Sequence, residues 1–206
     1  MADTILSDSV SKDDSGHTHV ALQSIHLSNL LSFGPDTPPL PLRLLNILIG
    51  ANGSGKSNLI DAISLLRSCA GDIQSTLRRG GGVLEWVWKG NPQKTASIEA
   101  VVGNPEYTQD IRHKIEFSAQ QQIVQIVDES IENTTPYEGN SDTYFYYRYQ
   151  KGHPVTNVSL DVGGRRLRHE EKIVGNQSIL NQRTDTTTYP EIAHISNQYN
   201  AFRIYR

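Results

Sequence analysis

The sequence lacks the features that mark several large classes of protein. Its 206 residues include a single cysteine, Cys69, so no disulfide bond can form within the chain and a reducing compartment is expected. No apolar run approaches the roughly 20 residues that a membrane span requires, and the N-terminus has no apolar stretch typical of a signal peptide. We therefore expect a cytoplasmic protein with no membrane partner.

The sequence also has only a small excess of one sign of charge. The formal net charge is −3, and four aspartates against one lysine account for it within the first 19 residues. The remaining chain is neutral, so bulk charge gives no argument for nucleic-acid binding, although a local basic patch is still open. The histidines show no metal-ligand spacing and the carboxylates form no pair suited to acid–base catalysis.

The composition divides the chain into a tail and a folded region. Residues 1–19 are rich in Ser, Asp, Thr and His without a sustained apolar period, which predicts a disordered acidic tail. Residues 20–206 are predicted to form one lobe. Within it we expect a strand, a loop and a helix over 20–71, a β-meander over 95–162, and a looped and helical segment over 176–206.

The first part of the lobe predicts an α/β fold class. The short apolar run 44–49 is typical of a strand buried on both faces of a parallel sheet. After a glycine-rich loop, residues 57–70 place apolar side chains at helical spacing, and Gly71 is expected to end this helix.

The second part of the lobe predicts an antiparallel β-subdomain. Turn residues separate five segments of strand character, near 95–102, 112–118, 121–128, 144–150 and 155–162. Toward the end of the chain, Pro190 is expected to open a helix, and residues 202–206 are expected to form a strand.

A phosphate-binding motif lies between the predicted strand and the predicted helix. Residues 50–57 match the pattern G-x-x-x-x-G-K-[ST]. The glycines let successive backbone N–H groups converge on phosphate oxygens, and the positive end of the helix adds to that field. Lys56 is expected to reach the β- and γ-phosphates, and the Ser57 hydroxyl to bind Mg²⁺. The alternative is a glycine-rich turn with a solvated lysine.

Two blocks of sequence resemble the start of the RecF/SMC/Rad50-like ATPases, an ABC-type branch of the P-loop NTPases. They are residues 22–33 (LQSIHLSNLLSF) and residues 50–63 (GANGSGKSNLIDAI), whose N-G-S-G-K-S-N core is specific to that branch. Residues 85–90 (EWVWKG), 189–191 and 202–206 look like a bacterial RecF-like AAA family ATPase. The resemblance implies a P-loop NTPase core of ABC/SMC-head type with an antiparallel β-subdomain, and ATP and Mg²⁺ as cofactors. It implies a Walker A site formed by Gly50, Asn52, Gly53, Ser54, Gly55, Lys56, Ser57 and Asn58, with Lys56 as the catalytic residue.

The resemblance also implies parts that this sequence does not contain. Such heads carry a signature motif of Leu-Ser-x-Gly type and a Walker B strand ending in Asp-Glu in their C-terminal half, and no signature motif occurs here. We therefore expect the N-terminal half of a head only. It should bind Mg-ATP but hydrolyse it very slowly until a second ATPase head or a partner chain supplies the missing motifs.

One segment superficially resembles a Walker B strand. Residues 123–130 (IVQIVDES) contain Asp128 and Glu129, but Gln125 interrupts the apolar run and the segment falls among the alternating strands. We interpret these two carboxylates as the solvated end of a hairpin.

A Q-loop glutamine, which contacts Mg²⁺ and senses the γ-phosphate, is a further part that the resemblance implies. Gln182 is the best placed candidate, between the β-subdomain and the helical segment, and Gln177 is the second. A surface amide in a loop is an equally good interpretation of either residue.

Three smaller features have both a functional and a structural interpretation. Arg78 and Arg79 could contact nucleotide or a partner head, or could belong to a solvated turn. Cys69 could be a nucleophile, but a small core residue is the expected interpretation. The aromatic run 144–149 and the basic run 165–169 could contact DNA. Strand alternation instead predicts a packed sheet, with Tyr144, Tyr146 and Arg148 on one face and Phe145, Tyr147 and Tyr149 on the other.

The preferred hypothesis is an ATP-binding lobe of a RecF/SMC-like ATPase in bacterial DNA repair, DNA maintenance or phage defence. The alternative is a truncated or split, non-catalytic interaction module that scaffolds a partner. A stand-alone P-loop kinase or GTPase is a third hypothesis, weakened because the sequence has no N-K-x-D guanine motif. An incomplete sheet would leave apolar edges exposed and would favour association.

Overall fold

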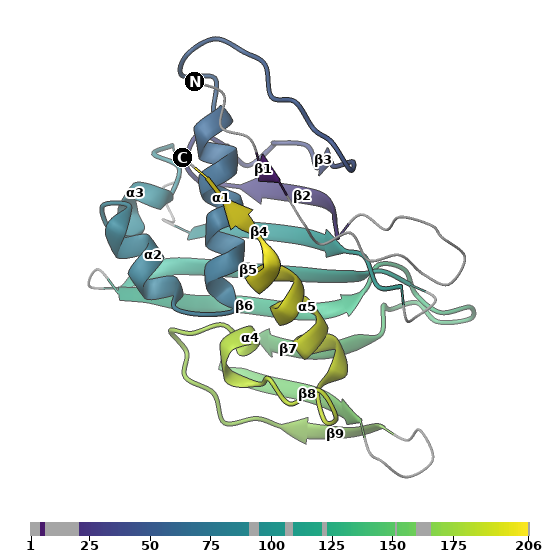
Figure 1. Cartoon of the computed structure of the whole chain (residues 1–206). Coiled ribbons are helices and arrows are strands. Elements are labelled where there is room, and N and C mark those ends of the chain that lie inside the picture. Colours follow the sequence, from purple (N-terminus) through teal and green to yellow (C-terminus); the bar gives the residue numbers. More distant parts are fainter. Residues whose placement is uncertain are drawn as a thin grey trace.

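The computed structural model describes residues 5–6, 21–90, 95–105, 109–120, 123–150, 152–159 and 166–205. Its main feature is an eight-stranded sheet with helices packed on one face (Figure 1). Every strand pair in this sheet is antiparallel, and the order is β3-β2-β4-β5-β6-β7-β8-β9. The strands are β2 (Leu22–Ser28), β3 (Leu40–Pro41), β4 (Thr95–Val102), β5 (Ile111–Gln120), β6 (Ile123–Asn133), β7 (Phe145–Gln150), β8 (His153–Ser159) and β9 (Arg166–Glu170).

The helices come from two separate parts of the chain. The first group is α1 (Lys56–Cys69), α2 (Ile73–Arg79) and α3 (Val83–Trp86), and the second is α4 (Ile179–Gln182) and α5 (Pro190–Ala201). In Figure 1, α1 and α5 lie across the sheet, with α2 and α3 beside α1. Both groups therefore contribute to one core.

The core forms because strand and helix periodicities bury matching faces. In β4 every second residue is buried, and the apolar face of α1 includes Leu59, Ile63 and Leu66. These side chains belong to one continuous apolar cluster that also includes residues of α5. Cys69 is fully buried in it, as predicted, and burial raises the pKa of its thiol, with the Glu129 carboxylate adding to the effect. The thiol is thus an inert core group.

Most of the predicted strands are observed close to their predicted bounds. The strand predicted over 95–102 is β4, and the next three predicted strands correspond to β5, β6 and β7. The fifth corresponds to β8, although residues 160–162 lie outside the described residues. The helix α1 is observed, and α5 begins at Pro190 as predicted. Strand β9 was not predicted, because its exposed sequence RLRHE has no apolar alternation.

The predicted parallel strand over 44–49 is wrong for this structure. These residues have no strand partner, and most of their apolar side chains are exposed, Ile47 by 74% and Ile49 by 91%, whereas Leu48 is partly buried against the core. A strand needs a neighbour for its backbone N–H and C=O groups, and no parallel pair occurs among the described strands. Most of the apolar run therefore lies open to solvent.

Only a small part of the predicted tail is described. Strand β1 (Ile5–Leu6) pairs with β10 (Arg203–Ile204), and the remainder of residues 1–19 lies outside the described residues, as do Arg165 and Arg206. The division into a disordered tail and a lobe stays a prediction. No helix in the described part of the chain combines the length and apolarity needed to cross a membrane.

Candidate nucleotide site

The predicted phosphate-binding loop is an exposed turn that leads directly into α1. Two of its glycines, Gly53 and Gly55, have φ angles of +81° and +90°, in the left-handed region that favours glycine. A side chain at Gly50 would lie only 2.7 Å from the Ser54 Oγ. The close packing of the loop thus requires glycines, which leaves its backbone groups accessible to a phosphate.

The start of α1 is open to an anion. Gly55 is the N-cap, and no side-chain hydrogen bond from the described residues caps this end of the helix. The first N–H groups of an α-helix have no partner within the helix, and they carry a partial positive charge. Ser57, in the first turn, has an exposed side chain. These donors and this hydroxyl fit a nucleotide phosphate with its Mg²⁺.

Lys56 holds the loop closed. Its Nζ donates to the carbonyl oxygens of Gly50, at 2.8 Å, and Ala51, at 2.7 Å, and it lies 3.3 Å from the Ser54 Oγ. The ammonium group is thereby fixed above the same turn whose N–H groups would receive phosphate. This is the position from which a lysine can neutralise phosphate charge.

A second turn, at residues 29–34, lies against the phosphate loop. A side chain at Gly55 would lie 2.9 Å from the Ser32 Oγ, so Ser32 approaches the loop backbone closely. Leu31 has a φ of 53°, which costs about 1 kcal/mol for a residue with a Cβ. A hydrogen bond of 2.6 Å from the Leu31 N–H to the Trp86 carbonyl holds this conformation.

Ser32 was not among the predicted site residues. It lies in the first of the two blocks that resemble the ATPases, but nothing in the residue pattern indicates that this block touches the second. The contact arises because β2 ends beside the start of α1, so the two blocks meet at the loop (Figure 1).

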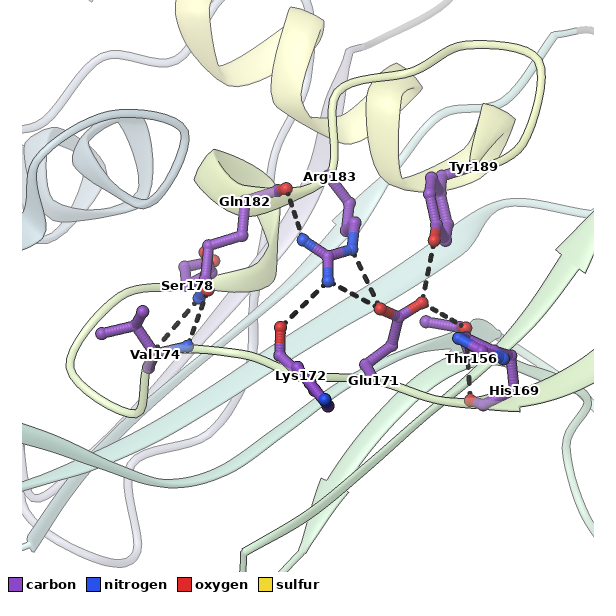
Figure 2. A network of polar contacts seen from close by, with 9 residues as sticks. All are labelled: Thr156, His169, Glu171, Lys172, Val174, Ser178, Gln182, Arg183 and Tyr189. Atoms are coloured by element: carbon purple, nitrogen blue, oxygen red, sulfur yellow. Dashed lines mark hydrogen bonds and ion pairs between the residues drawn. The ribbon is translucent and has the colours of Figure 1, made fainter.

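The structure does not bring the predicted Q-loop residues to the loop. The Gln182 amide binds its own neighbourhood: Oε1 accepts from the Val174 N–H at 2.7 Å (Figure 2), and Nε2 donates to the Gln177 carbonyl at 2.9 Å. Gln177 in turn accepts a hydrogen bond from Asn181. The assignment of Gln182 or Gln177 as a Mg²⁺ ligand therefore finds no support in this arrangement.

The separation of Gln177 and Gln182 from Ser57 follows from the position of α4. The first N–H of α4, at Ile179, donates to Glu129, the carboxylate that also acts on Cys69 at the last residue of α1. Lys56 is the first residue of α1, and a helix of 14 residues is about 20 Å long. The two glutamines thus lie toward the opposite end of α1 from the loop (Figure 1).

Asp128 and Glu129 lie in the antiparallel sheet, as expected for residues that do not form a Walker B pair. Their exposure to solvent, however, differs from the prediction. They are in the middle of β6. Asp128 points to the outer face and accepts from the Lys114 Nζ at 3.3 Å, whereas Glu129 is completely buried. The prediction of a solvated hairpin end is wrong for Glu129.

The predicted faces of the aromatic run are wrong for Phe145 and Tyr146, because a β-bulge interrupts β7. Tyr147 and Tyr149, by contrast, are buried opposite Arg148 as predicted. Ile131 pairs with Tyr147 and Glu132 pairs with Phe145, so Tyr146 is an extra residue and is buried. Phe145 therefore shares the outer face with Arg148, whose guanidinium lies 4.7 Å from the ring centroid.

The outer face of the sheet carries balanced charge. Arg148 and Arg112 both lie near Glu132, at 3.1 and 3.8 Å, and Lys114 pairs with Asp128 at 3.3 Å. Arg168 contacts the Phe145 ring, but most of the basic groups here are already paired. This face thus gives no electrostatic support for DNA contact.

Comparison with known proteins decides the family. A protein-family model described as "AAA domain, putative AbiEii toxin, Type IV TA system" matches residues 45–201, which is well over half of the chain. The chain belongs to this AAA family. The match begins in the exposed apolar run, includes the phosphate loop and ends in α5. The predicted resemblance to RecF/SMC-like ATPases of the ABC type is confirmed, and the α/β fold class with its antiparallel sheet fits this family.

The curated relatives of this AAA family member are much longer proteins. One is the chromosome partition protein Smc of Xanthomonas oryzae pv. oryzae, 29% identical over 147 residues that cover 69% of this chain and 11% of the relative. Another is Smc of Bordetella petrii, 33% identical over 90 residues that cover 41% of this chain and 7% of the relative. The chain thus spans about a tenth of the length of the Smc proteins it matches.

A solved SMC ATPase chain, from a study of ATP-driven dimerization and DNA-stimulated activation of SMC ATPases, is also similar. It is 19% identical with a TM-score of 0.42, and the alignment covers 54% of this chain and 68% of that one.

Proposed function

We propose that this chain is an ATP-binding lobe of a RecF/SMC-like ATPase. The observation that carries the proposal is the glycine-rich turn at residues 50–57, which places the Lys56 ammonium beside the uncapped start of α1. Membership of the AAA family supports a nucleotide as the ligand. The match to the chromosome partition protein Smc supports a role of the larger assembly in DNA maintenance, and DNA repair and defence against phage are the other roles that we propose for it.

The residues of the loop would have separate roles. Gly53, Ser54 and Gly55 would donate backbone N–H groups to phosphate oxygens, and Lys56 would place its positive charge on the terminal phosphates. Ser57 would offer its hydroxyl to Mg²⁺, which neutralises phosphate charge when bound. Gly50, Asn52 and Asn58 would shape the two ends of the loop.

Hydrolysis would require a second protein surface. No signature motif occurs in the sequence, and Glu129 is buried against β5 and α4, so it would not activate water at the loop. The exposed run 44–49, which leads straight into the loop, supports docking of a partner lobe or head beside the nucleotide. The isolated chain should therefore bind Mg-ATP and release phosphate only very slowly.

Calorimetric titration with Mg-ATP tests the proposal. We expect saturable binding to the wild type and at least a tenfold loss of affinity in Lys56→Ala, because a charge-assisted contact to phosphate is worth about 1.5 kcal/mol or more. Lys89→Ala is a matched control, since Lys89 pairs with Glu85 at 3.0 Å on the exposed surface and should leave affinity unchanged. Equal binding by the Lys56→Ala variant would contradict the assigned site.

The alternative function, a non-catalytic scaffold, is favoured by the same exposed run 44–49, which a partner could cover without nucleotide. Absence of Mg-ATP binding by a folded wild type would select this alternative. Rapid phosphate release by the isolated chain would argue against both proposals, because each requires a partner for turnover.

A further inference from the structure

A polar cleft of about 770 Å³ lies between α1 and α2, and its lining includes none of the loop residues 50–57. The two helices lie side by side (Figure 1), and Asn200 and Ile204, on either side of the start of β10, also line the cleft. Hydroxyl groups of Ser64 and Ser68 line the α1 side, and Ser75 and Thr76 line the α2 side. The cleft is therefore a second candidate site, separate from the phosphate loop.

Two guanidinium groups at this cleft have no acidic partner. Arg67, in the last turn of α1, and Arg79, at the end of α2, both line it, and neither forms an ion pair with any carboxylate of the described residues. The nearby carboxylates have other roles: Asp72 accepts the Ser75 N–H at 3.0 Å as the cap of α2, and Asp61 has an interaction of its own. The lining thus contains two arginines and two aspartates, and the arginines are the pair without an acidic partner among the described residues.

A third donor lies in the wall of the cleft. Trp86 lines it with a buried indole, and no hydrogen-bond acceptor for its Nε1–H exists among the described residues. This nitrogen lies directly against Gly80, where even a Cβ would approach it to 2.3 Å. A buried N–H without an acceptor is costly, and its position in the wall makes its NMR signal a reporter of what occupies the cleft.

We propose that this cleft binds a small molecule carrying a phosphate group, anchored by Arg67 and Arg79. Guanidinium groups match the oxygen geometry of phosphate, and two of them without an acidic partner in the described part of the chain favour an anionic ligand. Arg79 donates from its Nε to the Ser75 carbonyl, at 3.4 Å. The volume is that of an ordinary small-molecule site, larger than one phosphate ion requires. The hydroxyls of Ser75 and Thr76 would serve the remainder of the ligand.

Indole NMR signals provide the test, in the full chain carrying Lys56→Ala so that phosphate binding at the loop is weakened. Inorganic phosphate and ribose 5-phosphate are titrated at constant ionic strength. We expect a saturable shift of the Trp86 Nε1–H signal and tighter binding of the sugar phosphate than of phosphate alone. Trp88 does not line the cleft and serves as the internal control. Because binding at the loop is weakened in this variant, failure here leaves the proposed function untouched.

Three arginine variants make the test specific. Arg67→Ala and Arg79→Ala should each weaken the Trp86 response about tenfold, as expected for loss of one charge-assisted contact. Arg78→Ala is the matched control, because Arg78 is an exposed neighbour in α2 that does not line the cleft. No saturable shift at Trp86, equal shifts at both tryptophans, or equal weakening by all three variants would each overturn the proposal.

Discussion

His113 Nε2 lies 3.2 Å from Glu129 Oε1 across strands β5 and β6, and neither side chain is exposed. The same carboxylate accepts hydrogen bonds from the Ser178 hydroxyl at 2.5 Å and from the Ile179 N–H at 3.0 Å. The other ring nitrogen of His113 lies 3.1 Å from the Tyr199 hydroxyl of α5. One buried carboxylate thus ties the sheet to α4 and, through His113, to α5.

Removal of this carboxylate should destabilise the fold rather than the nucleotide site. Glu129→Ala leaves buried donors on His113, Ser178 and Ile179 without an acceptor, and we expect a loss of about 3 kcal/mol in the free energy of unfolding, measured by urea denaturation. Glu138→Ala, at an exposed turn, should change it by less than about 0.5 kcal/mol.

Nucleotide measurements on the conservative variant separate the two roles of Glu129. Glu129→Gln should bind Mg-ATP like the wild type under conditions where it is folded, because its contacts lie on β5 and α4 rather than at the loop. A wild type with fast phosphate release that Glu129→Gln abolishes would instead identify a catalytic glutamate.

Stability should also depend on pH through Glu171. Burial alone would raise the pKa of this carboxyl, but hydrogen bonds from Arg183, Tyr189 and Thr156 outweigh burial and lower the pKa below its usual value (Figure 2). A lowered pKa in the folded state stabilises the protein above the unfolded pKa of about 4.3, and the stabilisation is lost as the pH falls through the folded pKa.

Glu171→Gln should therefore reduce the difference in unfolding free energy between pH 7 and about pH 3, a range that extends below the unfolded pKa. The comparison uses urea denaturation at both pH values, with Glu138→Gln as the exposed control. An undiminished pH dependence in Glu171→Gln would show that other carboxyl groups account for the acid sensitivity.

The sequence predicted what local patterns determine. The alternation of 95–102 and the helical spacing after the loop both correspond to observed elements, because one face of each is buried against the same core. The glycine and lysine positions of the loop follow from a motif whose geometry is local. The β-bulge at Tyr146 changes only the pairing of β7 with β6, and no residue pattern marked it.

Long-range polar contacts were not predictable from the sequence. Glu129, Glu171 and Glu191 are all buried, yet in the sequence they have the same signature as solvated residues. Each carboxylate can be buried because it has a partner in the folded state, such as Arg183 for Glu171 or Arg166 for Glu191. These partners are not neighbours in the sequence, so no local pattern indicates the pairs. The run 44–49 shows the opposite case: its apolar pattern predicted burial, but the described strands include no neighbour for it.

The contact between Ser32 and Gly55 predicts a coupled effect on the phosphate loop. Gly55→Ala combines an unfavourable positive φ of +90° with a Cβ placed 2.9 Å from the Ser32 Oγ. We expect a loss of about 1 to 2 kcal/mol in stability and weaker Mg-ATP binding, measured by urea denaturation and calorimetry.

Adding Ser32→Ala should recover part of that loss, because it removes the crowded hydroxyl but not the backbone strain. The double-mutant cycle isolates the contact. Gly53→Ala is the strain-only control, since a Cβ there has no atom within 4 Å and Ser32→Ala should not rescue it. Additive effects of Gly55→Ala and Ser32→Ala would mean that the two turns do not press on one another.

The exposed apolar run before the loop predicts self-association of the isolated chain. Leu45, Ile47 and Ile49 are 69%, 74% and 91% exposed, and large apolar side chains exposed close together in the sequence favour association in water. Light scattering at increasing concentration should show a rising mean mass.

Leu45→Lys with Ile47→Lys should lower that mass with little change in unfolding free energy, because neither side chain is buried. Ile123→Lys, at an exposed position of β6, controls for added charge alone. A strictly monomeric wild type at high concentration would show that the run needs no cover, and the proposed docking surface for a partner lobe would then lose its main support.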